Sequence, residues 1–239
     1  MGKKEEPMIA YYEDARHFAW LVNGWICHGN NEIDATQIKP KNIRLTGKTG
    51  KRRNTRTRSR FRDISKEIGK VKVILVIGLE LQSFIDYSMP VRVMDYDALE
   101  YKDQIRRIIS ERKAEMAALD GKTKVNLSPL KKEDRLNPVI TLVLFFNAGE
   151  WDGPRSLFDM LDMSNPIFEK YAQDYKLHII SPQQIADDEL EKFHSSLREV
   201  IGCIKYSKDK NKLANFIQDN PRMNMEIEAA RVIEMITQI

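Results

Sequence analysis

Two carboxylates and an amide are spaced so that one end of a predicted hairpin could carry chemistry. Glu80 and Gln82 follow an apolar run at 71–81 and, being two residues apart in an extended strand, project from the same face. If the run at 61–68 pairs with it antiparallel, Asp63 stands opposite Glu80, with the two side chains about 5 Å apart. Two carboxylates that close repel each other unless a proton or a cation lies between them.

A hard divalent cation would satisfy this pair, because Mg²⁺ prefers oxygen ligands, takes one or two carboxylates and keeps waters for a substrate phosphate. Asp63 and Glu80 are therefore the predicted ligands of Mg²⁺, with Mn²⁺ as an accepted substitute. Such a site suits phosphodiester hydrolysis, in which Gln82 would orient the water or contact the phosphate. In the structural alternative, Glu80 caps a strand end in solvent and Asp63 pairs with Arg62 or another neighbour.

A basic segment precedes the first of these carboxylates. Residues 39–62 contain 11 lysines and arginines and no acid. Because the net charge of the whole chain is +4, the residues outside this segment have a net charge of −7. Mutually repelling charge without apolar periodicity predicts a mobile loop, and DNA phosphates are the polyanion that it would neutralise. A solvated loop that serves only solubility is the alternative. The residues predicted to hold the duplex are Arg52, Arg53, Arg56, Arg58 and Arg60.

Hydrophobic periodicity predicts the elements that must position these groups. We expect a helix at 8–27, a long helix from Ser88 whose apolar stripe runs from Val91 to Met116, and a loop at 39–62. The other expected elements are strands at 61–68, 71–81, 138–146 and 177–180, and helices at 155–163, 166–175, 187–206, 208–219 and 223–239. This order indicates an α/β fold, with a small mixed central sheet flanked by helices over residues 1–182 and a helical C-terminal extension at 183–239.

The composition excludes several other classes of protein. Cys27 and Cys203 lie in apolar stretches and give no disulfide framework, which favours a reducing, cytoplasmic setting. No run reaches the ~18 uncharged apolar residues of a membrane span. The first apolar stretch is interrupted by Glu13, Asp14 and Arg16, so a signal peptide is not expected either.

Several blocks of residues, in a fixed order, give the chain a family resemblance. They are Asp63-Ile64, VIGLELQS at 76–83, YSMPVRVMDYDALEY at 87–101, NPVITLV at 137–143, WDGPRSL at 151–157 and the segment 14–23. With these blocks the chain resembles the Rpn family of recombination-promoting nucleases and transposase-like proteins, within the PD-(D/E)XK nuclease superfamily. The likeness spans most of the chain up to Met163 and is weaker in the helices that follow.

The resemblance implies a restriction-endonuclease-like core and a metal-dependent DNA endonuclease. Asp63 would match the motif aspartate, and Glu80 and Gln82 the Glu-x-Gln variant of the (D/E)XK motif, in which lysine is the commoner third residue of the superfamily. Asp14 would be an additional acidic ligand, whereas Trp20 departs from the aspartate that the family often has there. The basic segment is not implied, because related sequences are often acidic in this interval.

Arg92 and Tyr96 lie four residues apart on the predicted long helix and can share a face beside the strand end. They would contact phosphate, buttress Glu80 or act as a structural anchor. DNA is the expected partner, and a homodimer is a candidate assembly because nucleases that cut both strands are often dimers. The rival function is a catalytically weak nucleic-acid-binding protein that retains the nuclease fold.

Overall fold

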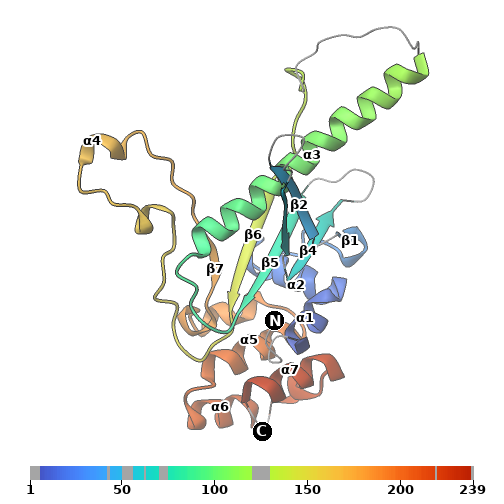
Figure 1. Ribbon diagram of the computed structural model, residues 1–239. Coiled ribbons are helices and arrows are strands. Elements are labelled where there is room, and N and C mark those ends of the chain that lie inside the picture. Colours follow the sequence, from blue (N-terminus) through green and yellow to red (C-terminus); the bar gives the residue numbers. More distant parts are fainter. Residues whose placement is uncertain are drawn as a thin grey trace.

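The computed structural model describes residues 6–41, 44–49, 56–61, 63–69, 75–119, 130–218 and 220–237, and for 44–49 and 56–61 it describes the backbone. A five-stranded mixed sheet carries helices on both faces (Figure 1). The predicted α/β class with a helical C-terminal part is thus confirmed. No helix within the described ranges combines the length and the apolar character that crossing a bilayer requires.

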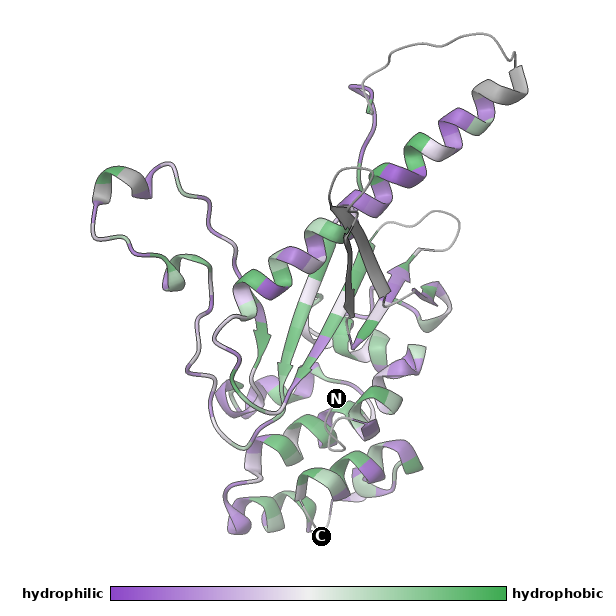
Figure 2. Ribbon diagram, viewed as in Figure 1, coloured by the Kyte–Doolittle hydropathy of each residue, from purple (hydrophilic) through white to green (hydrophobic). Residues whose placement is uncertain are grey.

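The sheet has the order β1-β4-β5-β6-β7. β1 and β4 pair antiparallel, as do β4 and β5, whereas β5, β6 and β7 run parallel. β5 and β6 are almost continuously apolar because helices cover both of their faces (Figure 2). The strands are β1 (Ile38–Pro40), β4 (Ile64–Ile68), β5 (Leu75–Gln82), β6 (Val139–Phe145) and β7 (His178–Ile180).

The predicted antiparallel hairpin of β4 and β5 is confirmed. Its register pairs Ile64 with Leu79, so one further step places Asp63 opposite Glu80. The expected strand at 71–81 is described from Leu75 onward, and its first residues lie outside the described ranges.

Four helices cover one face of the sheet: α1 (Glu6–Glu13), α2 (Ala15–Trp25), α5 (Ser196–Tyr206) and α7 (Ile227–Thr237). Ile77, Leu79 and Leu81 of β5 lie in one buried cluster with residues of these helices. The predicted helix at 8–27 is divided, because Asp14 is extended and its carboxylate accepts the Arg16 N–H as the N-cap of α2. α1 and α7 pack on each other, so segments near both ends of the chain lie side by side (Figure 1).

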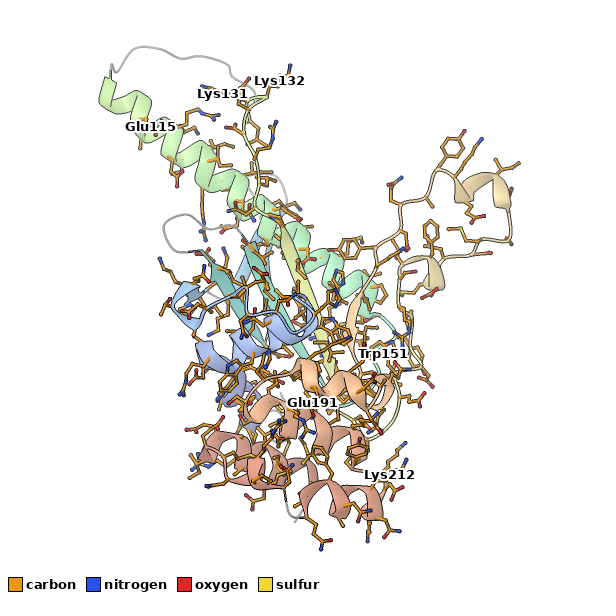
Figure 3. The ribbon with its side chains drawn as sticks, turned by 180° about the vertical axis from the view of Figure 1, so that it is seen from behind. Glu115, Lys131, Lys132, Trp151, Glu191 and Lys212 are labelled. Atoms are coloured by element: carbon orange, nitrogen blue, oxygen red, sulfur yellow. The ribbon has the colours of Figure 1, made fainter. Side chains whose placement is uncertain are left out.

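The long helix α3 (Met89–Leu119) covers the other face, but not with the predicted stripe. Val91 is 43% exposed, and the buried positions among the described side chains of α3 are Met89, Pro90, Val93, Tyr96, Asp97, Leu99, Glu100 and Gln104. This face of the sheet carries Ser65, Glu80 and Thr141, so the helix buries polar groups that match it. The outer end of α3, near Glu115, extends away from the sheet, and Lys131 and Lys132 lie at that end of the molecule (Figure 3).

The predicted loop at 39–62 is wrong over three stretches, of which the first, Lys39 and Pro40, belongs to β1. Strands β2 (Arg44–Thr49) and β3 (Arg56–Phe61) form a separate antiparallel ladder that pairs Arg44 with Phe61, and β2 lies beside α3. Arg56, Arg58 and Arg60 occupy alternate positions of β3. Arg52 and Arg53 lie outside the described residues.

Several predicted C-terminal helices are shorter than expected. The helices expected at 155–163 and 166–175 are reduced to η2 (Phe158–Met160) and α4 (Pro166–Glu169), in a connection that stands off the sheet (Figure 1). The helix expected at 187–206 is divided into η4 (Asp188–Lys192) and α5, while α6 (Lys210–Ile217) and α7 are helical as expected. The division into domains at residue 182 stays a prediction. The remaining 3₁₀ turns are η1 (Ala35–Gln37), η3 (Pro182–Gln184) and η5 (Pro221–Met223).

Candidate active site

Glu80 lies under α3 at the carboxyl end of β5. Its side chain is fully buried, and its Oε2 atom accepts a hydrogen bond from Arg92 Nη2 at 2.8 Å. Burial acts to lower the pKa of Arg92, but the charge of Glu80 and a hydrogen bond with Tyr96 raise it above its ordinary value. Glu80 therefore does not cap a strand end in solvent, and its charge is balanced inside the fold.

Asp63 meets the same end of β5 from the neighbouring strand. Its Oδ2 atom accepts the Leu81 N–H at 2.8 Å, which places the carboxylate beside the main chain directly after Glu80. Tyr96 lies within the field of both acids: burial is the largest cause of its raised pKa, and the charges of Glu80 and Asp63 raise the pKa further. The structure thus brings the two predicted metal ligands together; Arg62, the alternative partner, lies outside the described residues.

Arg92 links this pair to the connection between β5 and α3. Its Nε atom donates to Tyr96 Oη at 3.1 Å and its Nη1 atom to Asp86 Oδ2 at 3.2 Å. Burial acts to raise the pKa of Asp86, but hydrogen bonds from Ser88 and Arg92 lower it below its ordinary value. Asp86 is not among the residues that the sequence predicts for the site. An acid two residues before Ser88, the predicted helix cap, was the available signal.

Of the two remaining predicted residues, Gln82 lies at the site and Asp14 does not. Gln82 is 4% exposed and follows Glu80 on the same face of β5. Asp14 instead forms an ion pair with Arg16 at 2.7 Å, and this hydrogen bond is the main cause that lowers the pKa of Asp14 to about 2. Among the described side chains no group of three acids, histidines or cysteines could hold a metal ion, so Asp14 adds no third carboxylate to the pair.

The donor set at the end of β5 fits a hard divalent cation. Asp63 and Glu80 offer carboxylate oxygens and Gln82 an amide oxygen, with no thiolate or imidazole among them. A cation held by two carboxylates would keep its other positions for water or phosphate oxygens, as Mg²⁺ does in nucleotide-processing sites. Arg92 would remain next to this cation, because it already binds Glu80.

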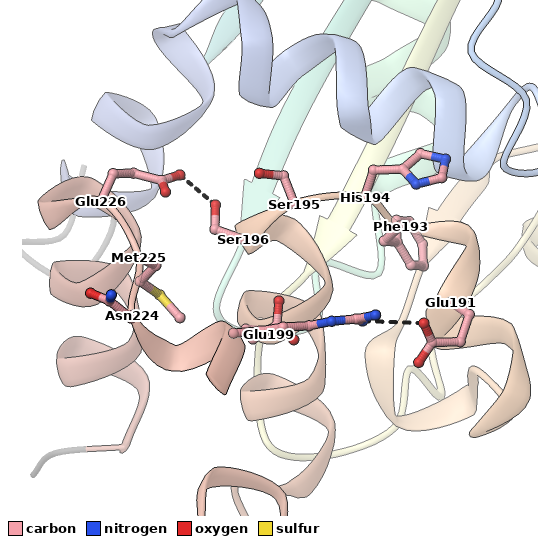
Figure 4. Close-up of a pocket in the computed structure, with 10 residues that line it drawn as sticks. Glu191, Phe193, His194, Ser195, Ser196, Glu199, Asn224, Met225 and Glu226 are labelled. Carbon is pink, nitrogen blue, oxygen red and sulfur yellow. Dashed lines mark hydrogen bonds and ion pairs between the residues drawn. The ribbon is translucent and has the colours of Figure 1, made fainter. Parts of the chain in front are cut away.

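A second group of polar side chains lies on the opposite side of the sheet, around a hollow of about 390 Å³ (Figure 4). Ser196 donates a hydrogen bond to Glu226, and His17 Nε2 lies 2.9 Å from the same Glu226 oxygen. The Tyr11 hydroxyl lies 2.9 Å from Ser196 Oγ. In a nucleophilic relay the hydroxyl would face the imidazole and the acid would orient the imidazole. Here the Ser196 hydroxyl and the His17 imidazole both contact the Glu226 carboxylate, so this arrangement is not a relay. Together with Tyr11, these side chains connect α1 and α2 to α5 and the start of α7.

Comparison with known proteins gives one match. The family model described as "Putative transposase, YhgA-like" matches residues 65–231. The match includes Glu80, Gln82, Arg92 and Tyr96 and begins two residues after Asp63. No curated protein and no solved structure matches the chain.

Proposed function

Because the chain belongs to the family "Putative transposase, YhgA-like", whose model covers more than half of it, we propose that it is a metal-dependent DNA endonuclease that hydrolyses phosphodiester bonds. The observation that carries the proposal is the position of Asp63 and Glu80, which come from neighbouring strands and meet at one end of the sheet. Two adjacent carboxylates are the ligands that Mg²⁺ needs for phosphoryl chemistry.

Each residue at this end of the sheet has a role in the proposed reaction. Asp63 and Glu80 would hold Mg²⁺ or Mn²⁺, which would supply polarisation of the phosphate and a water molecule of lowered pKa. Gln82 orients that water or donates from its amide to a phosphate oxygen. Arg92 holds the Glu80 carboxylate in position through the 2.8 Å contact.

The basic segment supplies the proposed contacts with the DNA backbone. Arg56, Arg58 and Arg60 lie on β3, which ends two residues before Asp63. Arginine and lysine neutralise phosphates without reading the bases, so these contacts would position the duplex and leave sequence preference to other groups. Arg52 and Arg53 have the same role in the proposal.

Plasmid cleavage tests the proposal. With Mg²⁺ present, we expect Asp63→Asn and Glu80→Gln each to lower the cleavage rate by at least ~100-fold, because each removes a ligand charge. The amide oxygen in Asp63→Asn can still accept the Leu81 N–H, which preserves the local backbone. Glu111→Gln, an exposed acid on α3, is the matched control and should cleave like the parent chain. Undiminished cleavage by both site variants would refute the proposed site.

The ion pair of Glu80 with Arg92 favours a second candidate function. A guanidinium that already neutralises Glu80 can stand in for a cation, so the chain would then be a catalytically weak DNA-binding protein that keeps the nuclease fold. Calorimetric titration with Mn²⁺ separates the two functions. The endonuclease binds the ion and Asp63→Asn does not, whereas the binding protein retains DNA affinity with neither metal binding nor cleavage.

A further inference from the structure

Two aromatic side chains lie exposed beside the proposed site, on the connection between β5 and α3. Phe84 and Tyr87 are each 62% exposed, and Val91, one turn into α3, is 43% exposed. These rings contribute little to the core of the fold, so packing alone does not explain them. We propose that Phe84 and Tyr87 form a stacking surface for unpaired bases of a DNA strand whose phosphates lie at Asp63 and Glu80. This inference rests on the proposed action on DNA.

The connection that carries the two rings is fixed at the residues between and around them. Asn147 Nδ2 donates to the Ser83 carbonyl at 2.6 Å. Ile85 packs into the cluster of Val143 and Trp151, and a Cβ on Gly153 would lie 2.7 Å from its Cγ2 atom.

Asp86, the residue between Ile85 and Tyr87, accepts hydrogen bonds from the Ser88 N–H at 2.9 Å and the Ser88 hydroxyl at 2.6 Å. Residues 83, 85, 86 and 88 are therefore anchored, while positions 84 and 87 face solvent. A surface held in place in this way loses little conformational entropy when a ligand binds.

The two rings also lie close to the carboxylate pair. Arg92 binds Glu80 at 2.8 Å and Asp86 at 3.2 Å, so one guanidinium separates Glu80 from the residue that precedes Tyr87. Phe84 follows Gln82 by two residues, in the bend directly after the end of β5. A strand whose phosphate lay at a cation held by Asp63 and Glu80 would therefore have its neighbouring bases within reach of Phe84 and Tyr87.

Base chemistry selects the class of ligand. Every nucleobase has a flat face that stacks on an aromatic ring, so this kind of contact tolerates any sequence. In a duplex those faces are covered by the neighbouring base pairs and become accessible only when a base is splayed out of the stack. The expected ligand is thus a single strand, or the unpaired part of a flap, gap or fork.

Binding measurements without a divalent cation test the stacking surface separately from cleavage. We would titrate the full chain in EDTA with an aminopurine-labelled single strand and with the matching duplex. Stacking on one ring contributes about 5- to 150-fold in affinity, so Phe84→Ala and Tyr87→Ala should each weaken binding of the single strand within that range. Duplex affinity should stay unchanged, and Tyr87→Phe, which keeps the ring, should bind like the parent chain.

Tyr171→Ala is the matched control, because Tyr171 is 70% exposed on the distant connection between β6 and β7. It should leave both affinities and the aminopurine quenching unchanged. If Phe84→Ala and Tyr87→Ala bind the single strand as tightly as the parent chain, or lose single-strand and duplex affinity equally, the stacking surface is wrong. A parent chain that binds no DNA would overturn the proposed function as well, whereas unaffected variants of a chain that cleaves DNA would overturn the stacking surface alone.

Discussion

Arg92 is the residue that connects the acidic end of β5 to the segment that follows it. Its planar guanidinium binds two carboxylates and a phenol at once, a geometry that the single ammonium of lysine cannot reproduce. One of those carboxylates, Glu80, is fully buried. Because a buried charge that loses its counter-charge is costly, Arg92 also stabilises the fold.

Replacing Arg92 should therefore lower stability. We expect Arg92→Ala to reduce the free energy of unfolding by about 2 kcal/mol, less than the ~3–5 kcal/mol that breaking a fully buried pair costs, because Arg92 is itself 32% exposed. Arg92→Lys should recover part of the loss. Urea unfolding measures the change, and Lys113→Ala, on an exposed position of α3, is the control.

A double-mutant cycle with Glu80→Gln then isolates the Arg92–Glu80 pair, because coupled residues give a non-additive energy. Additive effects of Arg92→Ala and Glu80→Gln would contradict the account of Arg92 as the counter-charge of Glu80.

At the residue scale, the sequence predicts contacts that follow from strand geometry and misses those that depend on tertiary packing. Asp63 opposite Glu80 follows from the alternation of two neighbouring runs. For Asp86 the sequence offers only its spacing from Ser88, since its position beside Arg92 depends on a connection that Asn147 and the packing of Ile85 on Trp151 hold in place. Asp14 was attributed to a metal site, but its local role as a helix cap prevails.

At the scale of elements, α3 meets the sheet through polar contacts. Thr141 Oγ1 donates to Asp97 at 2.6 Å, and Lys41 lies between Glu67 and Glu100 at 2.7 and 2.8 Å. Near the start of β6, Gln104 Oε1 accepts a hydrogen bond from the Asn137 N–H at 2.8 Å, and Gln104 Nε2 donates to the Asn137 carbonyl at 3.1 Å. These bonds fix the rotation of α3, and with it the direction from which Arg92 reaches Glu80.

The pairing of Gln104 with Asn137 gives a prediction at this scale. Gln104→Leu should lower the free energy of unfolding by about 2 kcal/mol, because it leaves a main-chain N–H and a carbonyl of Asn137 without their partner. Thermal or urea unfolding measures the loss. Lys102→Leu makes the same kind of change at an exposed position of α3, and an equal loss in both variants would contradict the role of Gln104.

Each element that differs from its prediction does so for a physical reason. The residues at 155–163 and 166–175 favour helix, but their connection stands off the sheet and has no partner face on which a longer helix could pack (Figure 1). In the basic segment, the alternation from Arg56 to Phe61 carried a strand signal that charge repulsion obscured. The buried face of α3 differs from the predicted apolar stripe because the sheet face beneath it combines polar groups such as Glu80 and Thr141 with the apolar cluster of Val143.

At the scale of the whole molecule, charge is distributed unevenly. Residues 39–62 hold 11 basic residues, and the rest of the chain carries −7. A nucleic acid would therefore be attracted to the segment that contains β2 and β3, and repelled on average by the remainder.

Salt dependence measures this attraction. Replacing Arg56, Arg58 and Arg60 by serine should weaken DNA binding, and the slope of log affinity against log salt should fall by about 0.9 for each phosphate contact that is lost. Lys131→Ser with Lys132→Ser, at the far end of α3 (Figure 3), is the control and should leave the slope unchanged. An unchanged slope in the arginine variant would remove β3 from the proposed DNA interface.

The packing of α1 on α7 determines when this molecule can fold during translation. Met8 and Tyr11 of α1 lie in the same buried cluster as Ala229 and Val232 of α7. A ribosome must therefore release α7 before α1 can be covered. Until then the nascent chain lacks a completed core behind β5, so the strand that carries Glu80 reaches its final support only after α7 has been synthesised.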